Sequence, residues 1–251
     1  MEWISHTTTG FFLGQLLVKE KDRPRRAGWW WAAASVSPDW LEWGTRWFGD
    51  IHRGVTHSLY VWPVLALGWA WAARRWGRNA TGEVAGPMKM WAVFFVVVGS
   101  HLLLDVFMAY RWYLLWPFSE ENWAWGIMPL FDVYIFAGWL ALWLLYRKMR
   151  LSSATTAKLG LAIFLAMFVA RGAGKVRATR LAMENPATAV IADIRTRPTY
   201  YTPWLWLVRD GRGDADWTVV NVVTGDVLEG YTRGHGFPPI PGRELVKLPA
   251  R

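Results

Sequence analysis

A histidine and an aspartate stand four residues apart in the segment His101-Leu-Leu-Leu-Asp105. Residues at this spacing share one face of a helix, so the imidazole and the carboxylate would point the same way. The surrounding segment is apolar, and an ionisable group inside an apolar helix is costly and indicates a functional site. The pair could bind a metal ion, or it could form a hydrogen bond that stabilises a helix bundle; the spacing fits both.

A second chemically capable segment is His52-Arg-Gly-Val-Thr-His-Ser58. Imidazole is a common ligand of zinc and similar ions, and the planar guanidinium of Arg53 suits a phosphate or a carboxylate. Histidine and arginine also extend their polar ends toward lipid headgroups at the ends of membrane helices. An interfacial polar cap is the simpler interpretation of this segment when it is considered alone.

Three further residues have an ordinary explanation when each is taken singly. Asp39 follows a proline and fits a turn, His6 lies near the N-terminus where histidines are usually solvated, and Asp132 could cap a following helix. Together with the two segments above, however, the chain presents the order His, Asp, His-x4-His, His-x3-Asp. This set offers enough ligands for about one to three ions, and without cysteine it must use nitrogen and oxygen donors.

The elements that would position these residues are predicted to be membrane helices. The chain of 251 residues is 53% hydrophobic, and several of its apolar runs approach the roughly 20 residues that cross a bilayer. These runs lack the alternation of β-strands, and 21 tryptophans are typical of a protein with membrane interfaces. We predict an all-α polytopic membrane helical bundle of about five to six segments. They are residues 3–18, 27–36, 55–73, 89–107, 127–146 and 157–170, of which the first two could instead be a re-entrant pair.

The net charge of +9 comes from lysines and arginines that cluster beside the apolar runs, within residues 19–26, 74–78 and 147–150. Cytoplasmic loops of membrane proteins carry such clusters, so no nucleic-acid partner is expected. With these clusters placed in the cytoplasm, the histidines and aspartates described above fall near the outer face. Because the rule makes no use of these residues, their coincidence at one membrane level favours a single site. One conflict remains, since a sixth segment places the basic residues of 171–180 outside.

The composition changes after Gly172, and we predict a membrane bundle with the metal site over residues 1–172 and a C-terminal part over 173–251. Residues 175–190 fit an amphipathic helix on the membrane surface. A small β-rich module follows, because short apolar runs there are separated by turn residues. Its strands are expected at 203–209 and 217–223, with another turn at 224–226 before a further short strand.

Over about residues 1 to 140 the sequence resembles the YdjM-like family of inner-membrane-associated metal-dependent hydrolases, also described as LexA-binding. The matching pieces are His6-x3-Gly10, Pro38-Asp39, His52-Arg-Gly-x-Thr-His-Ser58 and Ser100-His101-x3-Asp105, with Pro117-Phe118-Ser119 and Phe131-Asp132 further on. Many members carry a second acid or a histidine after the early aspartate, whereas Trp40-Leu41-Glu42 follows here, so either Glu42 replaces that ligand or the ligand position is absent. The order of ligands is also similar to that of zinc-dependent phospholipase C, which implies phosphoester chemistry.

The resemblance and the residues together predict a multi-pass protein of the bacterial inner (cytoplasmic) membrane, with a zinc-dependent hydrolase site near the outer face. The expected substrate is a phosphoester in a lipid or a lipid-linked molecule, held by Arg53. The catalytic residues are expected to be His52 and Asp39, with His52 either a metal ligand or a proton-transfer group. The expected metal ligands are His6, Asp39, His52, His57, His101, Asp105 and Asp132.

Two other functions fit the same residues. A metal-binding or transport protein would use these ligands without hydrolysis, but it would need a polar path toward the inner face, and the apolar segments below His101 and Asp105 show none. A non-catalytic membrane partner would use the histidines structurally and would bind no stoichiometric metal. Apart from the lipid bilayer and a lipid substrate, the sequence predicts no partner and no oligomeric state.

Overall fold

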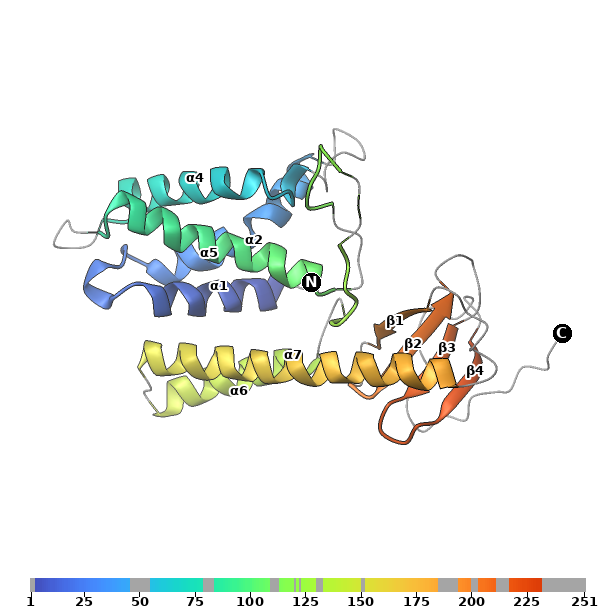
Figure 1. Cartoon of the computed structure of the whole chain (residues 1–251). Coiled ribbons are helices and arrows are strands. Elements are labelled where there is room, and N and C mark those ends of the chain that lie inside the picture. The colour runs from blue at the N-terminus through green and yellow to red at the C-terminus, as the bar shows by residue number, and fades with distance from the viewer. Residues whose placement is uncertain are drawn as a thin grey trace. The chain divides into compact units, whose positions relative to one another are not determined.

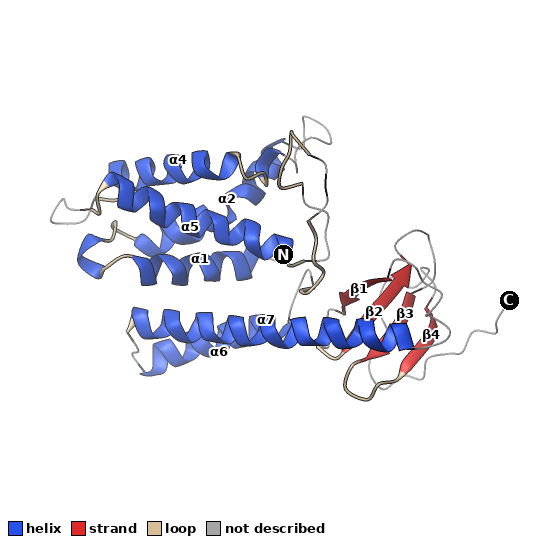
Figure 2. Ribbon diagram, in the orientation of Figure 1, coloured by secondary structure: helices blue, strands red, loops and turns tan. Residues whose placement is uncertain are grey.

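The computed structural model describes residues 3–45, 55–78, 84–108, 113–119, 121, 123–129, 133–149, 152–184, 194–199, 203–210 and 217–231, which form helices followed by a small sheet (Figure 1). The helices are α1 (Trp3–Leu17), the short 3-10 helix η1 (Glu20–Asp22), α2 (Ala27–Thr45), α4 (Val61–Trp76), α5 (Pro87–Val106), α6 (Val133–Met149) and α7 (Ser153–Glu184). The strands are β1 (Ile194–Pro198), β2 (Leu205–Asp210), β3 (Trp217–Asn221) and β4 (Val227–Tyr231). The predicted mostly helical chain with a small C-terminal β module is confirmed (Figure 2).

The chain divides into two compact units. The first comprises Met1–Trp125 and Tyr134–Leu165, and the second comprises Gly126–Val133 and Ala166–Arg251. Helix α7 runs without a break through residues 172 and 173, where the sequence predicts a boundary. The division into domains at that point therefore stays a prediction.

Two helices within the described residues are long and apolar enough to cross a membrane. They are α5 and the part of α7 from Ala154 to Glu184. The apolar part of α6, Val133–Tyr146, is shorter. Helix α5 begins and ends close to the predicted segment at 89–107, because it is apolar apart from one lysine, Ser100 and the His–Asp pair.

Helices α1, α2, α4 and α5 pack around one apolar core in the first unit. Helix α4 shows how the sequence directs this packing, because Ala66, Ala70 and Ala73 lie about one turn apart on one face and are all buried. Leu67 and Trp71 project from the other side and are exposed. Small residues toward neighbouring helices and large apolar residues toward lipid are typical of membrane bundles. The largest core side chains between these helices are Trp31, Met90 and Phe94.

Helix α2 corrects one expectation. The sequence predicts a short segment that ends before Asp39, whereas α2 continues through Pro38 for two further turns. A proline inside a helix removes the N–H that would bond to the carbonyl four residues earlier, here that of Ala34. The hydroxyl of Ser37 donates a 2.7 Å hydrogen bond to this same carbonyl. The replacement bond lets the helix continue, and Asp39 lies on the helix rather than in a turn.

Helix α7 corrects a second expectation. The sequence predicts an apolar segment at 157–170 and a separate amphipathic helix from residue 175, but the structure has one helix of 32 residues. Gly172 and Gly174 each disfavour the helix by only about 1 kcal/mol relative to alanine. No proline follows them before Glu184, and good helix formers such as alanine, arginine and lysine fill most of the positions between.

The C-terminal sheet has the strand order β1-β2-β3-β4 with antiparallel neighbours. Strands β2 and β3 are the predicted hairpin, and their antiparallel register confirms it. Alternation along β2 buries Trp206 and Val208 against Ala178 and Ala182 of α7. Strand β1, with the sequence Ile-Arg-Thr-Arg-Pro, was not predicted, because its charged residues leave little hydrophobic signal.

Candidate metal centre

Five of the residues singled out in the sequence lie together in the helix bundle. His6 comes from α1, Asp39 from α2 and His57 from the turn before α4, while His101 and Asp105 come from α5. The histidines and Asp105 are almost completely buried, and Asp39 is the most exposed of the five, with 16% of its side chain accessible.

The Nε2 atom of His101 lies at the middle of the cluster. It is 3.1 Å from Oδ2 of Asp105, 3.2 Å from Nε2 of His57 and 3.5 Å from Oδ1 of Asp39. The i, i+4 spacing on α5 brings the first of these partners to one face of the helix. The other two partners, from α2 and from the turn before α4, are far away in the sequence, so only the tertiary fold brings them to this nitrogen.

The opposite nitrogen of His101 determines what its Nε2 atom can do. The Nδ1–H of His101 donates a 2.7 Å hydrogen bond to the backbone carbonyl of Ser35. A carbonyl oxygen can only accept, so the proton of a neutral imidazole must sit on Nδ1 and leave a lone pair on Nε2. That lone pair then faces two carboxylate oxygens and a second imidazole nitrogen. A ring proton on Nε2 of His57, a further proton or a cation must lie among these atoms, because their lone pairs would otherwise repel one another.

The two ring nitrogens of His57 also have different neighbours, one outside the cluster and the others within it. Its Nδ1 atom lies 2.8 Å from the hydroxyl of Thr56. Its Nε2 atom lies 3.5 Å from Oδ1 of Asp39 and 3.5 Å from Oδ2 of Asp105. Histidines that bind metals nearly always have their second ring nitrogen held by an outer partner in this way.

His6 completes the cluster from the other side of Asp105. Its Nε2 atom lies 3.3 Å from Oδ1 of Asp105, and its ring stacks on that of His101 with centroids 3.9 Å apart. Its Nδ1 atom is buried and has no hydrogen-bond partner within the part of the chain that the structure describes. A buried ring nitrogen without a partner is costly, and on this nitrogen His6 lacks the outer partner that His57 and His101 have.

Close packing of α1 on α2 makes this arrangement possible. Gly10 lies one turn after His6, and a Cβ atom at this position would overlap the side chain of Ser35 and crowd the carbonyl of Trp31. The glycine therefore lets α1 approach α2 closely beside the carbonyl that orients His101. On the opposite side, Nε1 of Trp69 donates a 3.0 Å hydrogen bond to Ser37, which fixes the same part of α2 to α4.

The ligand atoms fall into two overlapping groups, each compact enough to surround one cation. His6, His101 and Asp105 form one group, and Asp39, His57 and His101 form the other, with all ligand atoms of a group within 4.8 Å of one another. Imidazole nitrogens and carboxylate oxygens suit zinc and related divalent ions. A divalent ion would also balance the two carboxylates in this buried place, so the residues present fit a metal.

The model of the YdjM inner membrane protein family matches residues 1–178, which is more than two thirds of the chain. The chain belongs to the YdjM inner membrane protein family. The match contains all five residues of the cluster and ends before β1, so the sheet lies outside it. No curated protein and no solved structure matches the chain.

Membership in the YdjM family confirms the resemblance noted in the sequence and places the chain in a family of inner membrane proteins. Of the residues predicted to act, His6, Asp39, His57, His101 and Asp105 come together in this YdjM protein. His52, Arg53 and Asp132 lie outside the described residues. Glu42 is buried one turn after Asp39, but it joins neither of the two ligand groups found among the described residues.

Two residues that orient the cluster of this YdjM protein were not predicted. Ser35 acts through its backbone carbonyl, which has no signature in the amino-acid sequence. Thr56 stands directly before His57 in the specific His-Arg-Gly-x-Thr-His-Ser block. A hydroxyl next to an expected ligand is a usable signal, since metal-binding histidines need an outer partner.

Proposed function

We propose that this YdjM-family protein is a membrane-bound, zinc-dependent hydrolase of a phosphoester in a lipid or lipid-linked substrate. The main observation behind this proposal is the hydrogen bond that Nδ1–H of His101 donates to the carbonyl of Ser35. It leaves a lone pair on Nε2 of His101 that faces Oδ1 of Asp39 and Oδ2 of Asp105, and two carboxylates held this close together in a buried cluster favour a cation among them.

The positions of the ligands support a centre arranged around Asp105. His101 offers one nitrogen only, since the other is engaged with Ser35, so it can serve a single ion. The two oxygens of Asp105 face different histidines: Oδ1 faces His6, and Oδ2 faces His57 and His101. Asp105 would therefore hold the metal together with His6, His57 and His101. The described residues support about one or two ions, within the range expected from the sequence.

A divalent ion held here would supply a Lewis acid for a phosphoryl oxygen and would activate water for attack. Asp39 would accept the proton of that water, because it is the most accessible of the five residues and lies 3.5 Å from both His57 and His101. The burial of His6, His57, His101 and Asp105 would keep bulk water from the ligands. His52 and Asp132 would add a ligand or a proton-transfer group, and Arg53 would hold the anionic substrate.

The membrane arrangement in this proposal has about five to six segments with the basic loops in the cytoplasm. The cluster then lies near the outer face, at a depth where a phosphoester at the end of a lipid could reach it. The buried ligands and the apolar surroundings on α5 support a substrate that enters from the membrane rather than a soluble one.

The proposal can be tested with detergent-purified protein in excess zinc. The substrates would be a soluble phosphomonoester, a soluble phosphodiester, phosphatidylglycerol and undecaprenyl diphosphate, with released phosphate or alcohol measured. We expect hydrolysis of at least one lipid substrate by the wild type and a kcat lowered by about 10²–10⁴-fold in Asp39→Asn. Equal rates in the wild type and Asp39→Asn, or no turnover on any substrate by a metal-loaded protein, would contradict it.

A further inference from the structure

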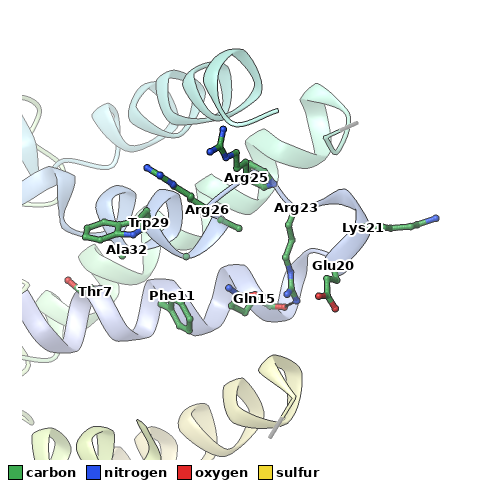
Figure 3. Close-up of a pocket in the computed structure, with 13 residues that line it drawn as sticks. Thr7, Phe11, Gln15, Glu20, Lys21, Arg23, Arg25, Arg26, Trp29 and Ala32 are labelled. Atoms are coloured by element: carbon green, nitrogen blue, oxygen red, sulfur yellow. Dashed lines mark hydrogen bonds between the residues drawn. The ribbon is translucent and has the colours of Figure 1, made fainter. Parts of the chain in front are cut away.

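A cationic cavity lies at the end of α1 and α2 that is remote from the metal centre (Figure 3). The cavity measures about 890 Å³ and lies between Phe11 and Gln15 of α1 and Arg26 and Trp29 near the start of α2. Lys21, Arg23 and Arg25 also line it, and among the described residues of its lining Glu20 is the single carboxylate. The charge of this cavity therefore favours an anion.

The three arginines that line this cavity differ in their contacts. Arg23 donates through Nε to the carbonyl of Val18 at 2.9 Å and through Nη2 to that of Gln15 at 2.6 Å, so it closes the end of α1. Figure 3 shows Arg23 reaching toward Gln15, while Arg26 extends on the side of Trp29 and Lys21 points away from both. The side chains of Arg25 and Arg26 are exposed at the rim of the cavity.

The backbone that carries Arg25 and Arg26 is fixed. The N–H of Arg25 donates a 2.6 Å hydrogen bond to the carbonyl of Gly77, and the carbonyl of Arg25 accepts one of 3.1 Å from Nε1 of Trp30. Arg26 has a φ of 58°, a left-handed conformation that is uncommon for residues other than glycine. Such strain persists where the surrounding structure enforces it, and it is often found at ligand sites. The two guanidinium groups therefore extend from a backbone segment whose conformation is fixed by these contacts.

A second cavity of about 520 Å³ continues from the first along α1. The two cavities share Thr7, Phe11, Gln15 and Ala32, and the second is closed on its far side by Trp139, Leu140 and Trp143 of α6. It is apolar over most of its lining. The continuous groove is therefore cationic at one end and aromatic and aliphatic along the rest, which matches an amphiphile with an anionic head.

We propose that this groove binds an anionic diacyl phospholipid of the inner leaflet, with its phosphate at Arg25 and Arg26 and an acyl chain along Phe11 and Leu140. Basic cavities between membrane helices on the cytoplasmic side recognise such headgroups, and arginine matches phosphate in geometry. Trp29, which is 77% exposed, would lie at the headgroup level. Gln15 stands nine residues after His6, about 14 Å along α1, so a phosphate held at Arg25 and Arg26 lies toward the opposite end of α1 from His6.

A second basic cluster at the same end of the bundle provides a matched comparison. Arg74, Arg75 and Arg78 line a separate cavity with Asp22 and Lys89, and these last two form a 3.2 Å ion pair. Among the residues that the structure describes, that cavity shares no lining residue with either cavity of the groove. Removing charge there tests general attraction to anionic lipid, whereas removing Arg25 and Arg26 tests the groove.

The experiment is native mass spectrometry of the detergent-purified full chain titrated with dioleoyl phosphatidylglycerol or dioleoyl phosphatidylcholine. We expect one phosphatidylglycerol to bind with at least about tenfold preference over phosphatidylcholine in the wild type and in Arg74→Gln/Arg75→Gln. Arg25→Gln/Arg26→Gln should lose this preference. Ala32→Leu, which narrows the passage shared by the two cavities, should weaken phosphatidylglycerol binding while its thermal unfolding stays close to that of the wild type.

Three results would overturn the proposal. Equal affinities for phosphatidylglycerol and phosphatidylcholine would show that the headgroup charge does not determine binding. An unchanged preference for phosphatidylglycerol in Arg25→Gln/Arg26→Gln would show that the lipid binds elsewhere. Displacement of phosphatidylglycerol by equimolar glycerol phosphate would show a site for a free anion instead of a lipid. None of these measurements depends on metal content or hydrolysis, so their outcome is separate from that of the proposed activity.

Discussion

Thr56 contacts the ring nitrogen of His57 that does not face the carboxylates, and Ser35 does the same for His101. Such outer partners fix the orientation and the tautomer of a ligating imidazole, and their loss commonly lowers metal affinity by about 10–100-fold. The contact with Ser35 uses the backbone and cannot be removed by substitution. The contact with Thr56 uses a side chain, so it can be tested directly.

Thr56→Val keeps the shape of the side chain and removes the hydroxyl. We expect its zinc affinity, measured by competition with a chromophoric chelator, to fall by about 10–100-fold while the protein stays folded. Thr9→Val is the matched control, because Thr9 is also buried in the bundle and its hydroxyl has no partner among the described residues. The control should bind zinc as the wild type does. Equal affinity in both variants would show that Thr56 does not orient a ligand.

At the scale of the helices, the approach of α1 to α2 depends on Gly10. Gly10→Ala would place a methyl group against Ser35 and Trp31, and crowding of this kind costs about 1–3 kcal/mol. We expect a lower unfolding temperature and weaker zinc binding, since the displaced residues are those beside His6 and His101. The measurement is thermal unfolding in detergent, with and without zinc.

Gly68→Ala is the control for that substitution. Gly68 lies on α4 with no atom within 4 Å of the position of its Cβ. Alanine there should stabilise the helix by about 0.5–1 kcal/mol through its higher propensity. A stabilised Gly10→Ala protein would mean that the close contact of α1 and α2 is not needed.

The helices also show which features of the fold and of the candidate site could be predicted from the sequence. The long apolar run of α5 and the four-residue spacing of His101 and Asp105 are local features, so both the helix and the shared face were predictable. The end of α2 was not, because a serine hydroxyl compensates for Pro38. The continuity of α7 through Gly172 and Gly174 could not be predicted either, because glycine lowers helix propensity without forbidding a helix. The hydrogen bond from His101 to the carbonyl of Ser35 could not be predicted, because every residue carries a backbone carbonyl.

For the whole molecule, the central expectation is that the metal centre lies toward the outer face and the arginine clusters lie in the cytoplasm. The chain has no cysteine, so single cysteines can report on each side. We expect Glu120→Cys to react with an impermeant thiol reagent in intact cells and Arg78→Cys to react only after lysis. The reversed pattern would place the centre on the cytoplasmic side and would also move the proposed lipid groove to the outer leaflet.

The most direct test of the metal centre is the metal content of Asp105→Asn. The substitution keeps the size of the side chain and removes the negative charge that faces His6, His57 and His101. A neutral amide is cheaper than a carboxylate inside a bundle, so the protein should still insert. If the cluster were only a hydrogen-bonded support, breaking it would instead cost about 1–3 kcal/mol of stability and leave metal content unchanged.

The measurement is elemental analysis of wild-type and Asp105→Asn protein, purified in detergent after growth in zinc, with thermal unfolding recorded on the same preparations. The account predicts about one or two zinc ions per wild-type chain and a sharp loss of zinc in Asp105→Asn. His101→Ala should lose zinc in the same way, and the double variant should be little worse than either single variant, because the two residues act as a unit. Full zinc occupancy in Asp105→Asn, or a wild-type protein that binds no stoichiometric metal, would contradict it.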